Sequence, residues 1–358
     1  MNDNDGMTAM MAETATRLFS TLCTDAVLAA AETGGLPQEL WGAVEELGLP
    51  AMLADERHGG IGAAPRDAVA VLRTAGRHAV PLPLAETMLA RWLLSRAGLE
   101  APAGPLAVAL GSDRKPWRIA RGQGGAALSG EQAAVAWGAS AAAVVAVAPA
   151  EGGVALGVLP PSRLRVEPGR NIAGEPRDRL AAQGAPLDAS ALLAGLDAEA
   201  VLRMAALLRA AMISGALENI LDMSVRYVRD RVQFGRPLAK FQAVQQQLAV
   251  MAGAVAAASA ITDAAASAVL RDDGMVMVAA ARARLAAAID TGAAVAHQVH
   301  GAMGFVREYP LHFSTRRLWG WRDEYGSAAE WRERLGRAFA GTPADALWPR
   351  LAAVGIGR

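Results

Sequence analysis

Apolar residues recur every three or four positions over most of the first hundred residues, which predicts α-helices. A first helix is expected to end near the sequence GGLP at 34–37, and a second covers 38–47. Two more are expected, one beginning at Pro65 and one following Pro83, since proline suits the first turn of a helix. These four helices form an expected N-terminal helical domain over residues 1–102.

The pattern changes between residues 103 and 195. Short apolar runs at 106–110, 142–147 and 154–159 are separated by Gly, Pro and Ser, which is typical of β-strands. This stretch is therefore expected to form a small β-barrel-like middle domain.

Longer helices are expected in the remainder, 196–358. Between Val201 and Ile213 apolar residues surround the helix axis, so this helix should be buried on several sides. A break at 235–237 precedes a second helix over 238–270, and a third covers 275–300. The expected fold is mainly α, with a C-terminal four-helix bundle after the small β domain.

Composition and charge exclude several classes of protein. The 35 basic and 35 acidic residues balance, so the positive surface that nucleic-acid binding requires is not expected. One cysteine, Cys23, can form no disulfide within the chain and no cysteine metal cluster. The first ten residues are acidic rather than basic, and no uncharged apolar run reaches the ~20 residues of a membrane span. A cytoplasmic protein without a membrane span is expected.

Two long motifs carry a family resemblance. Residues 231–245 read RVQFGRPLAKFQAVQ and residues 298–310 read QVHGAMGFVREYP, with Arg316 shortly after the second. Both resemble signatures of the flavin-dependent acyl-CoA dehydrogenases, in the same order and at the same separation. A looser match lies in the N-terminal helices, at 40–49 and 59–60.

The resemblance implies FAD as cofactor, bound partly by a neighbouring subunit. Arg231 offers a planar guanidinium to the diphosphate, and Gln242 adds neutral donors from the next helix. The resemblance places Gln298 to Gly301 beside the adenine end, where Gly301 lets backbone approach the cofactor. Phe234 and Ser327 complete the expected cofactor contacts.

The catalytic base is the weaker part of the match. The family places a glutamate before Gly-Thr or Gly-Ser in the loop after the arginine that Arg316 resembles, and Tyr325 occupies that slot here. Glu324 stands one residue earlier and is the candidate base, because a phenol with a pKa of ~10 is a poor base at neutral pH. Alternatively, Glu324 is an ion-paired carboxylate close to Arg322. The family's second base position, around 204–206, carries no carboxylate.

The middle domain also departs from the family. Its Thr-Glu-Pro and Trp-Ile-Thr segments, which meet the flavin ring, are absent, and the nearest remnant is LSGE at 128–131. Bacterial relatives that act on bulky thioesters such as steroid side chains include heterotetramers in which only some subunits hold flavin and base. A shortened chain of this kind is similar to the degenerate partner.

Three functions follow from the resemblance. The first is FAD-dependent α,β-dehydrogenation of an acyl-CoA, by this chain or an oligomer containing it, with an electron-transfer flavoprotein or similar acceptor. The second is a non-catalytic partner subunit of a heteromeric acyl-CoA dehydrogenase that completes the FAD site. Whichever function holds, the resemblance implies a homo- or hetero-oligomer, expected as a dimer of dimers. The third is a flavin oxidase or monooxygenase on the same scaffold. No metal site is expected, since His297 and His300 lack a third ligand at matching spacing, and Trp319 and Trp321 are expected to pack in the core or an interface.

Overall fold

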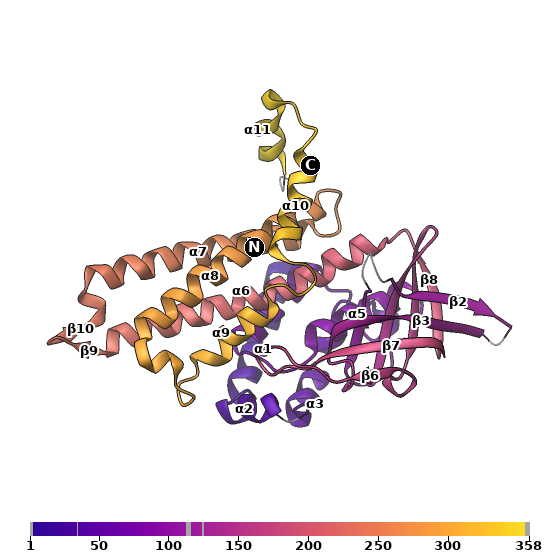
Figure 1. The fold of residues 1–358 in the computed structure, drawn as a ribbon, viewed down its shortest axis with the longest axis horizontal. Helices are drawn as coiled ribbons and strands as arrows, with labels where there is room; N and C mark the ends of the chain where they lie inside the picture. The colour runs from indigo at the N-terminus through magenta and orange to yellow at the C-terminus, as the bar shows by residue number, and fades with distance from the viewer. Residues whose placement is uncertain (1–2, 34, 112–115, 124, 355–358) are drawn as a thin grey trace. The chain divides into compact units, whose positions relative to one another are not determined.

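The structure is a computed structural model that describes residues 3–33, 35–111, 116–123 and 125–354. It is mainly helical with small sheets, which confirms the expected fold class (Figure 1). The described chain divides into two compact units. One contains 1–25, 69–80 and 206–358, and the other contains 26–68 and 81–205. The division into three domains stays a prediction.

The second unit combines short helices with all the longer strands. Its helical part has three α-helices and two 3-10 turns: α2 (Asp25–Thr33), α3 (Gln38–Glu46), η1 (Leu49–Ala51), η2 (Glu56–His58) and α5 (Leu84–Arg96). Glu45 at the end of α3 accepts hydrogen bonds from Trp41, Arg91 and the Gly104 backbone. One carboxylate therefore ties α3 to α5 and to the segment leading into the first strand.

Two four-stranded sheets form the β part of this unit. The first has the order β1 (Leu106–Ala109), β4 (Ala143–Ala150), β5 (Gly153–Leu159) and β8 (Ala189–Ala194), with only β1 and β4 parallel. The second has the order β2 (Arg118–Gly122), β3 (Gly125–Ala136), β7 (Arg177–Pro186) and β6 (Arg165–Glu167), all antiparallel. The expected runs at 106–110, 142–147 and 154–159 correspond to β1, β4 and β5.

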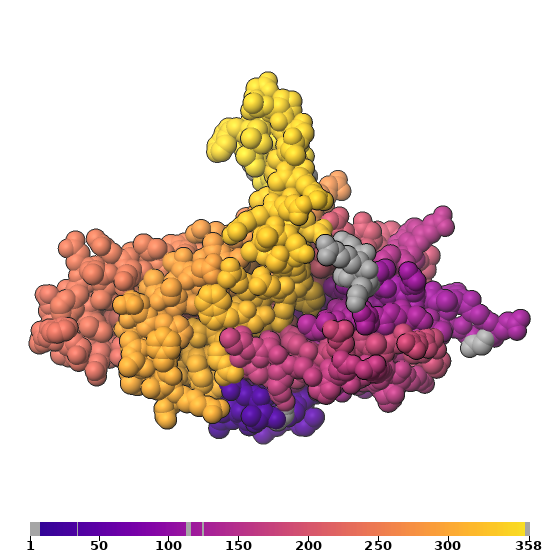
Figure 2. All heavy atoms as spheres, in the orientation of Figure 1, coloured from indigo at the N-terminus to yellow at the C-terminus, as the bar shows by residue number. Residues whose placement is uncertain are grey.

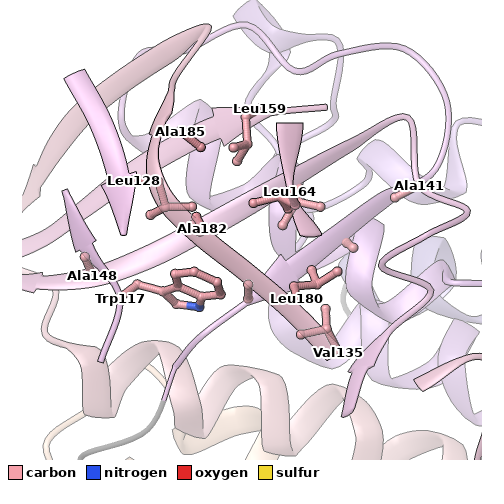
Figure 3. Close-up of a cluster of buried hydrophobic side chains, with 14 residues drawn as sticks. Trp117, Leu128, Val135, Ala141, Ala148, Leu159, Leu164, Leu180, Ala182 and Ala185 are labelled. Carbon is pink, nitrogen blue, oxygen red and sulfur yellow. The ribbon is translucent and has the colours of Figure 1, made fainter. Parts of the chain in front are cut away.

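Side chains from both sheets share one apolar core (Figure 3). Leu128 and Leu180 come from the second sheet and Leu159 from the first, and all three are fully buried. Trp117 lies among them, and its indole N–H donates to Gln132 at 3.2 Å, so the polar end of this aromatic ring is satisfied. The core explains why Ala- and Val-rich segments with modest strand propensity form sheets here.

Long helices build the first unit. They are α6 (Ala198–Asp230), α7 (Gln242–Ala268) and α8 (Gly274–His300), followed by α9 (Leu311–Trp321), α10 (Ala328–Phe339) and α11 (Ala344–Ala353), and α1 (Asp3–Leu22) also belongs to it. A Cβ on Gly292 of α8 would lie 3.1 Å from Leu217 of α6 and 4.0 Å from Met251 of α7. The three long helices therefore meet along one buried seam.

The second half of α4 (Pro65–Arg77) crosses α6 at very short range. A Cβ on Gly76 would lie 1.9 Å from the carbonyl oxygen of Met212, and a Cβ on Gly215 would lie 1.8 Å from that of Arg73. Only glycine permits this approach of two backbones. Beside the crossing, Arg73 pairs with Glu218 and Asp263, and Arg77 pairs with Glu218 and Asp222, so side chains of opposite charge flank the contact.

One N-terminal expectation is wrong. The single helix expected before residue 37 is two helices, because α1 ends at Leu22 and α2 begins at Asp25. Asp25 is an acidic residue in the first turn of α2, where it suits the helix dipole. Gly34, one of the expected stop residues, lies outside the described residues.

Two described helices, α6 and α7, are long and apolar enough to cross a membrane when judged by length and hydropathy alone. In α6, 89% of the apolar window is buried inside the protein, and in α7 the share is 33%. Helices in the core of other proteins pass the same test, so packing inside the protein explains the apolar composition of α6.

Replacing Gly76 with alanine is expected to destabilise the protein by about 1–3 kcal/mol or more, because the added methyl must push α4 away from α6. Thermal unfolding followed by circular dichroism measures the change. Gly253→Ala is the matched control. Gly253 lies in α7 with open space around its Cβ position, so alanine there should be neutral or slightly stabilising. Equal melting temperatures for the two variants would contradict the close crossing.

Candidate functional site

The first motif forms the connection between α6 and α7. After α6 ends at Asp230, the chain makes the two-residue strands β9 (Val232–Gln233) and β10 (Arg236–Pro237) and a 3-10 turn, η4 (Leu238–Lys240), before α7 starts at Gln242. The Leu238 amide donates to the Arg231 carbonyl at 2.9 Å. Arg231 therefore lies at the base of a tight hairpin that leads directly into the helix carrying Gln242.

The second motif lies at the same end of the bundle. Tyr227, one turn before Arg231, places its ring 4.4 Å from that of His300 at the end of α8, and 6.0 Å from that of Tyr309. Gly301 follows His300 directly. The end of α6 thus contacts the end of α8 within the first unit, and the hairpin places the start of α7 at the same end of the bundle (Figure 1).

The predicted cofactor residues at this end face solvent. Arg231, Gln242, Gln298 and Gly301 are exposed, and Figure 2 shows the α6–α7 connection at the surface. Gly301 has φ +58° and nothing within 4 Å of its Cβ position. A guanidinium, two carboxamides and an open glycine fit the diphosphate and adenine half of FAD, for which they supply cationic and neutral donors and room for close approach.

Phe234 marks the tip of the hairpin. Its side chain is 89% exposed and its φ is +52°, a left-handed conformation that costs energy for a bulky residue. Its ring meets that of Phe241 edge-on at 6.1 Å, and the Arg236 guanidinium lies 4.2 Å above the Phe241 ring. The predicted contact of Phe234 with the cofactor stays a prediction.

His300 is held in one tautomer. Its Nδ1 lies 2.7 Å from the Ala296 carbonyl, which can only accept, so Nδ1 carries the proton and Nε2 accepts from the Tyr309 hydroxyl at 3.0 Å. Burial lowers the pKa of His300 below its usual 6.5, while the Ala296 carbonyl raises it and His297 lowers it further. Burial likewise raises the pKa of Tyr309. The neutral pair braces the segment that carries Gly301.

Glu324 lies in the loop between α9 and α10, in an ion pair with Arg209 of α6. The Nε atom of Arg209 is 2.8 Å from the Glu324 carboxylate, and the two side chains are 3% and 16% exposed. The Arg209 guanidinium also lies 5.2 Å from the Trp321 ring centroid. The alternative of an ion-paired Glu324 therefore holds, but its partner is Arg209 rather than Arg322, which binds Asp290 through two hydrogen bonds.

A second buried cation holds the backbone of the same loop. Arg282 of α8 donates from Nη2 to the carbonyls of Arg322 at 2.9 Å and Glu324 at 2.7 Å. Burial lowers the pKa of Arg282 to about 10, Glu324 raises it, and Arg209 lowers it. Two guanidinium groups therefore converge on one carboxylate-bearing residue.

The residues after Glu324 turn sharply into α10. Tyr325 has φ +59° and Gly326 has φ +117°. Ser327 caps α10: its hydroxyl accepts from the Glu330 amide at 3.2 Å, and the Glu330 carboxylate accepts from the Ser327 amide at 2.7 Å. Whether Ser327 also contacts cofactor stays a prediction.

The remnant of the missing flavin motif serves the β part of the second unit. Ser129 accepts a hydrogen bond from the Gly184 amide at 3.0 Å, and Glu131 pairs with Arg179 at 3.7 Å. A cavity of about 360 Å³ in this unit is lined by residues that include Ser140, Arg170 and Asp178. The Asp178 carboxylate accepts from the amides of Ala139 and Gly169. None of the predicted site residues lines it.

Arg209 and Arg282 were not identified from the sequence. Arg209 is one of two charged residues, with Arg203, in the run 201–213, where the pattern predicts burial nearly all around the helix. A buried arginine requires a counter-charge, so an arginine in this run predicts a carboxylate partner elsewhere in the chain. Which carboxylate it meets depends on tertiary packing.

The other predicted residues divide by burial. Trp321 is fully buried as expected, whereas Trp319 is 40% exposed beneath the Arg322 guanidinium. His297 lies 3.2 Å from the Thr315 hydroxyl and stacks on Phe305, so the two histidines have different partners. Within the described residues, no group of three or more His, Cys, Asp or Glu could hold a metal.

Comparisons with known proteins agree with this architecture. Residues 7–102 match the acyl-CoA dehydrogenase N-terminal domain, and residues 196–321 match the acyl-CoA dehydrogenase C-terminal domain. The chain is 31% identical to the acyl-CoA dehydrogenase IpdE2 of Mycobacterium tuberculosis, over 82% of this chain and 84% of that protein. It is 30% identical to acyl-CoA dehydrogenase FadE27 of the same organism, over 86% and 89%.

The fold has a close counterpart among solved structures. The ChsE4–ChsE5 complex from Mycobacterium tuberculosis matches with a TM-score of 0.87 and 27% identity, covering 96% of this chain and 99% of that chain. The chain therefore belongs to the acyl-CoA dehydrogenase family. Members of this family are oxidoreductases with FAD as cofactor, which confirms both expectations at that level.

Glu324→Gln is expected to lower the free energy of unfolding by about 3–5 kcal/mol, because it leaves the buried Arg209 charge without its counter-charge. Denaturant unfolding measures this. Glu333→Gln is the matched control, since Glu333 pairs with Arg337 on the exposed face of α10 and should change stability by less than about 1 kcal/mol. Equal effects would show that the Arg209 pair carries no special weight.

Stability is expected to fall as the pH drops below about 6.5, partly through His300. Because the folded state lowers this pKa, the unfolded chain binds the proton more readily. The stabilisation is therefore complete above the unfolded pKa and is lost as the pH falls toward the folded one. One group contributes at most about 1.4 kcal/mol per pH unit. Melting temperatures between pH 7.5 and 5 should fall less steeply in His300→Gln, and an unchanged slope would exclude His300.

Proposed function

We propose that this chain acts in FAD-dependent α,β-dehydrogenation of an acyl-CoA thioester, within an oligomer that contains it. The observation that carries the proposal is the meeting of three helix ends whose Arg231, Gln242 and Gln298 side chains remain exposed in the single chain. Polar groups left at the surface in this arrangement are open to a diphosphate held mainly by a neighbouring subunit.

The reaction assigns separate tasks to the protein and the cofactor. A base removes the α-proton of the thioester, and FAD, when bound, accepts the β-hydrogen as hydride. Arg231 would neutralise diphosphate charge, Gln242 and Gln298 would orient the dinucleotide, and His300 with Tyr309 would keep the Gly301 turn in place. A separate electron-transfer flavoprotein or similar carrier would take the electrons onward.

A more specific candidate is a partner subunit of a heteromeric enzyme. The ion pair between Glu324 and Arg209 favours it, because a carboxylate committed to a buried guanidinium is not free to take a proton. The similarity to a chain of the ChsE4–ChsE5 complex supports the same assignment. In that arrangement a homologous subunit supplies the base.

Two preparations distinguish a self-sufficient enzyme from a partner subunit. In one, this chain is expressed alone; in the other, it is expressed together with a homologous subunit from the same source. A self-sufficient enzyme is expected to purify yellow, assemble as an oligomer and bleach when given an acyl-CoA. A partner subunit is expected to be colourless alone and to hold flavin only in the mixed oligomer. Colourless and inactive protein in both preparations would contradict the proposed function.

Arg231→Ala is expected to weaken FAD binding by the assembled oligomer at least tenfold, because a charge-assisted contact to the diphosphate is lost. Flavin retention on dilution, followed by fluorescence, measures the change. Arg229→Ala is the control, since Arg229 is also exposed near the end of α6 but lies outside the motif. Equal flavin loss in both variants would indicate a general charge effect.

A further inference from the structure

We propose that Arg209 is a positioning residue that withholds Glu324 from base chemistry, and that removing its charge releases a latent base. The inference rests on the proposed function, because it takes Glu324 to lie where an acyl thioester binds. It concerns a residue of α6 that neither sequence motif contains. It also explains how a chain can keep a carboxylate beside the family's base position without using it.

The geometry of the pair supports this role. Arg209 is 2% exposed, and its Nε atom lies 2.8 Å from the Glu324 carboxylate. Its Nη1 atom is 3.1 Å from the Met212 sulfur, and its guanidinium faces the Trp321 ring. The cation is thus fixed from three directions, and the carboxylate is the group that neutralises it.

The surrounding charges reinforce the pairing. Arg282 binds the Glu324 carbonyl from the other side, and among the described residues its Nε and Nη1 atoms have no hydrogen-bond partner. Asp323 is exposed, and Tyr325 has a left-handed backbone conformation. The Glu324 carboxylate and the Arg209 guanidinium thus form a pair of opposite charges in a largely buried site, and Arg282 places a second cation at the same loop.

The chemical step that Arg209 opposes can be written in full. The α C–H bond of the thioester breaks, its proton forms an O–H bond on the Glu324 carboxylate, and the electron pair stays on the substrate as an enolate. The Glu324 carboxyl then exchanges its proton for a deuteron of the solvent and returns that deuteron to the α-carbon, which regenerates the thioester and the carboxylate. This exchange needs no oxidant, so it reports on the base independently of hydride transfer.

The test uses the oligomer formed by this chain and its homologous subunit, with the base of the homologous subunit replaced by glutamine. Proton NMR follows the exchange of the α-protons of a 3-thia-acyl-CoA in D₂O. The variants are Arg209→Met, Arg209→Lys and Arg209→Met combined with Glu324→Gln. We expect Arg209→Met to raise exchange at least tenfold above the unmodified chain. Arg209→Lys should stay near the unmodified rate because it keeps the charge, and the combined variant should lose the gain.

Several results would overturn the proposal. Equal exchange by the unmodified chain and Arg209→Met, or a gain that persists without Glu324, would remove Arg209 or Glu324 from the mechanism. If Arg209→Met does not fold, the exchange rate of the unmodified chain is the test. Exchange above background that disappears in Glu324→Gln would show that Glu324 is already an active base, which contradicts the proposal. Failure of the subunit to bind the thioester also counts against the proposal, whereas flavin content, measured by absorbance, reports separately on the proposed function.

Discussion

The buried guanidinium of Arg209 is the constraint on which the functional half of the molecule depends. A cation buried in a largely apolar stretch of α6 must find a counter-charge, because an uncompensated charge in the interior costs several kcal/mol. Glu324 supplies it from a loop more than a hundred residues away in the sequence. The need to neutralise one side chain therefore fixes where this loop lies, and Arg282 then secures its backbone. The sharp turn at Tyr325 and Gly326 follows from holding Glu324 inward while α10 begins immediately afterwards.

The two halves of the candidate site consequently have opposite characters. At the end where α6, α7 and α8 meet, the polar side chains are exposed and backbone positions such as Gly301 are open. In the loop before α10, the candidate base Glu324 is largely buried and paired with Arg209 within the chain. Exposed donors are open to a ligand, whereas an internally paired carboxylate contributes stability. This asymmetry suits the proposed partner subunit, which would complete a cofactor site together with another chain.

The sequence predicted those features that short-range pattern determines. Apolar periodicity located α3, α7 and α8 to within a few residues, and motif spacing placed Arg231 and Gln298 at helix ends. The break between α1 and α2 was missed because apolar residues continue on both sides of Cys23 and Thr24, so no change of pattern marks it. The partner of Glu324 could not be predicted either. Arg322 is its neighbour in sequence, but the helical turn directs Arg322 to Asp290, and only tertiary packing brings Arg209 close.

In the proposed partner subunit, the helices themselves explain why one half of the site would be retained without the other. Arg231 and Gln242 lie at the two ends of the connection between α6 and α7, and the end of α6 also contacts the end of α8 through Tyr227 and His300, so changes there would disturb packing as well as binding. A free base is different, since nothing in the fold requires an unpaired carboxylate in an apolar interior. With Arg209 on the facing turn of α6, the Glu324 carboxylate stabilises the fold by pairing with a buried cation. In the proposed partner subunit, the pair with Arg209 therefore explains why Glu324 would not act as a base, and the packing of the bundle explains why the exposed end would be kept.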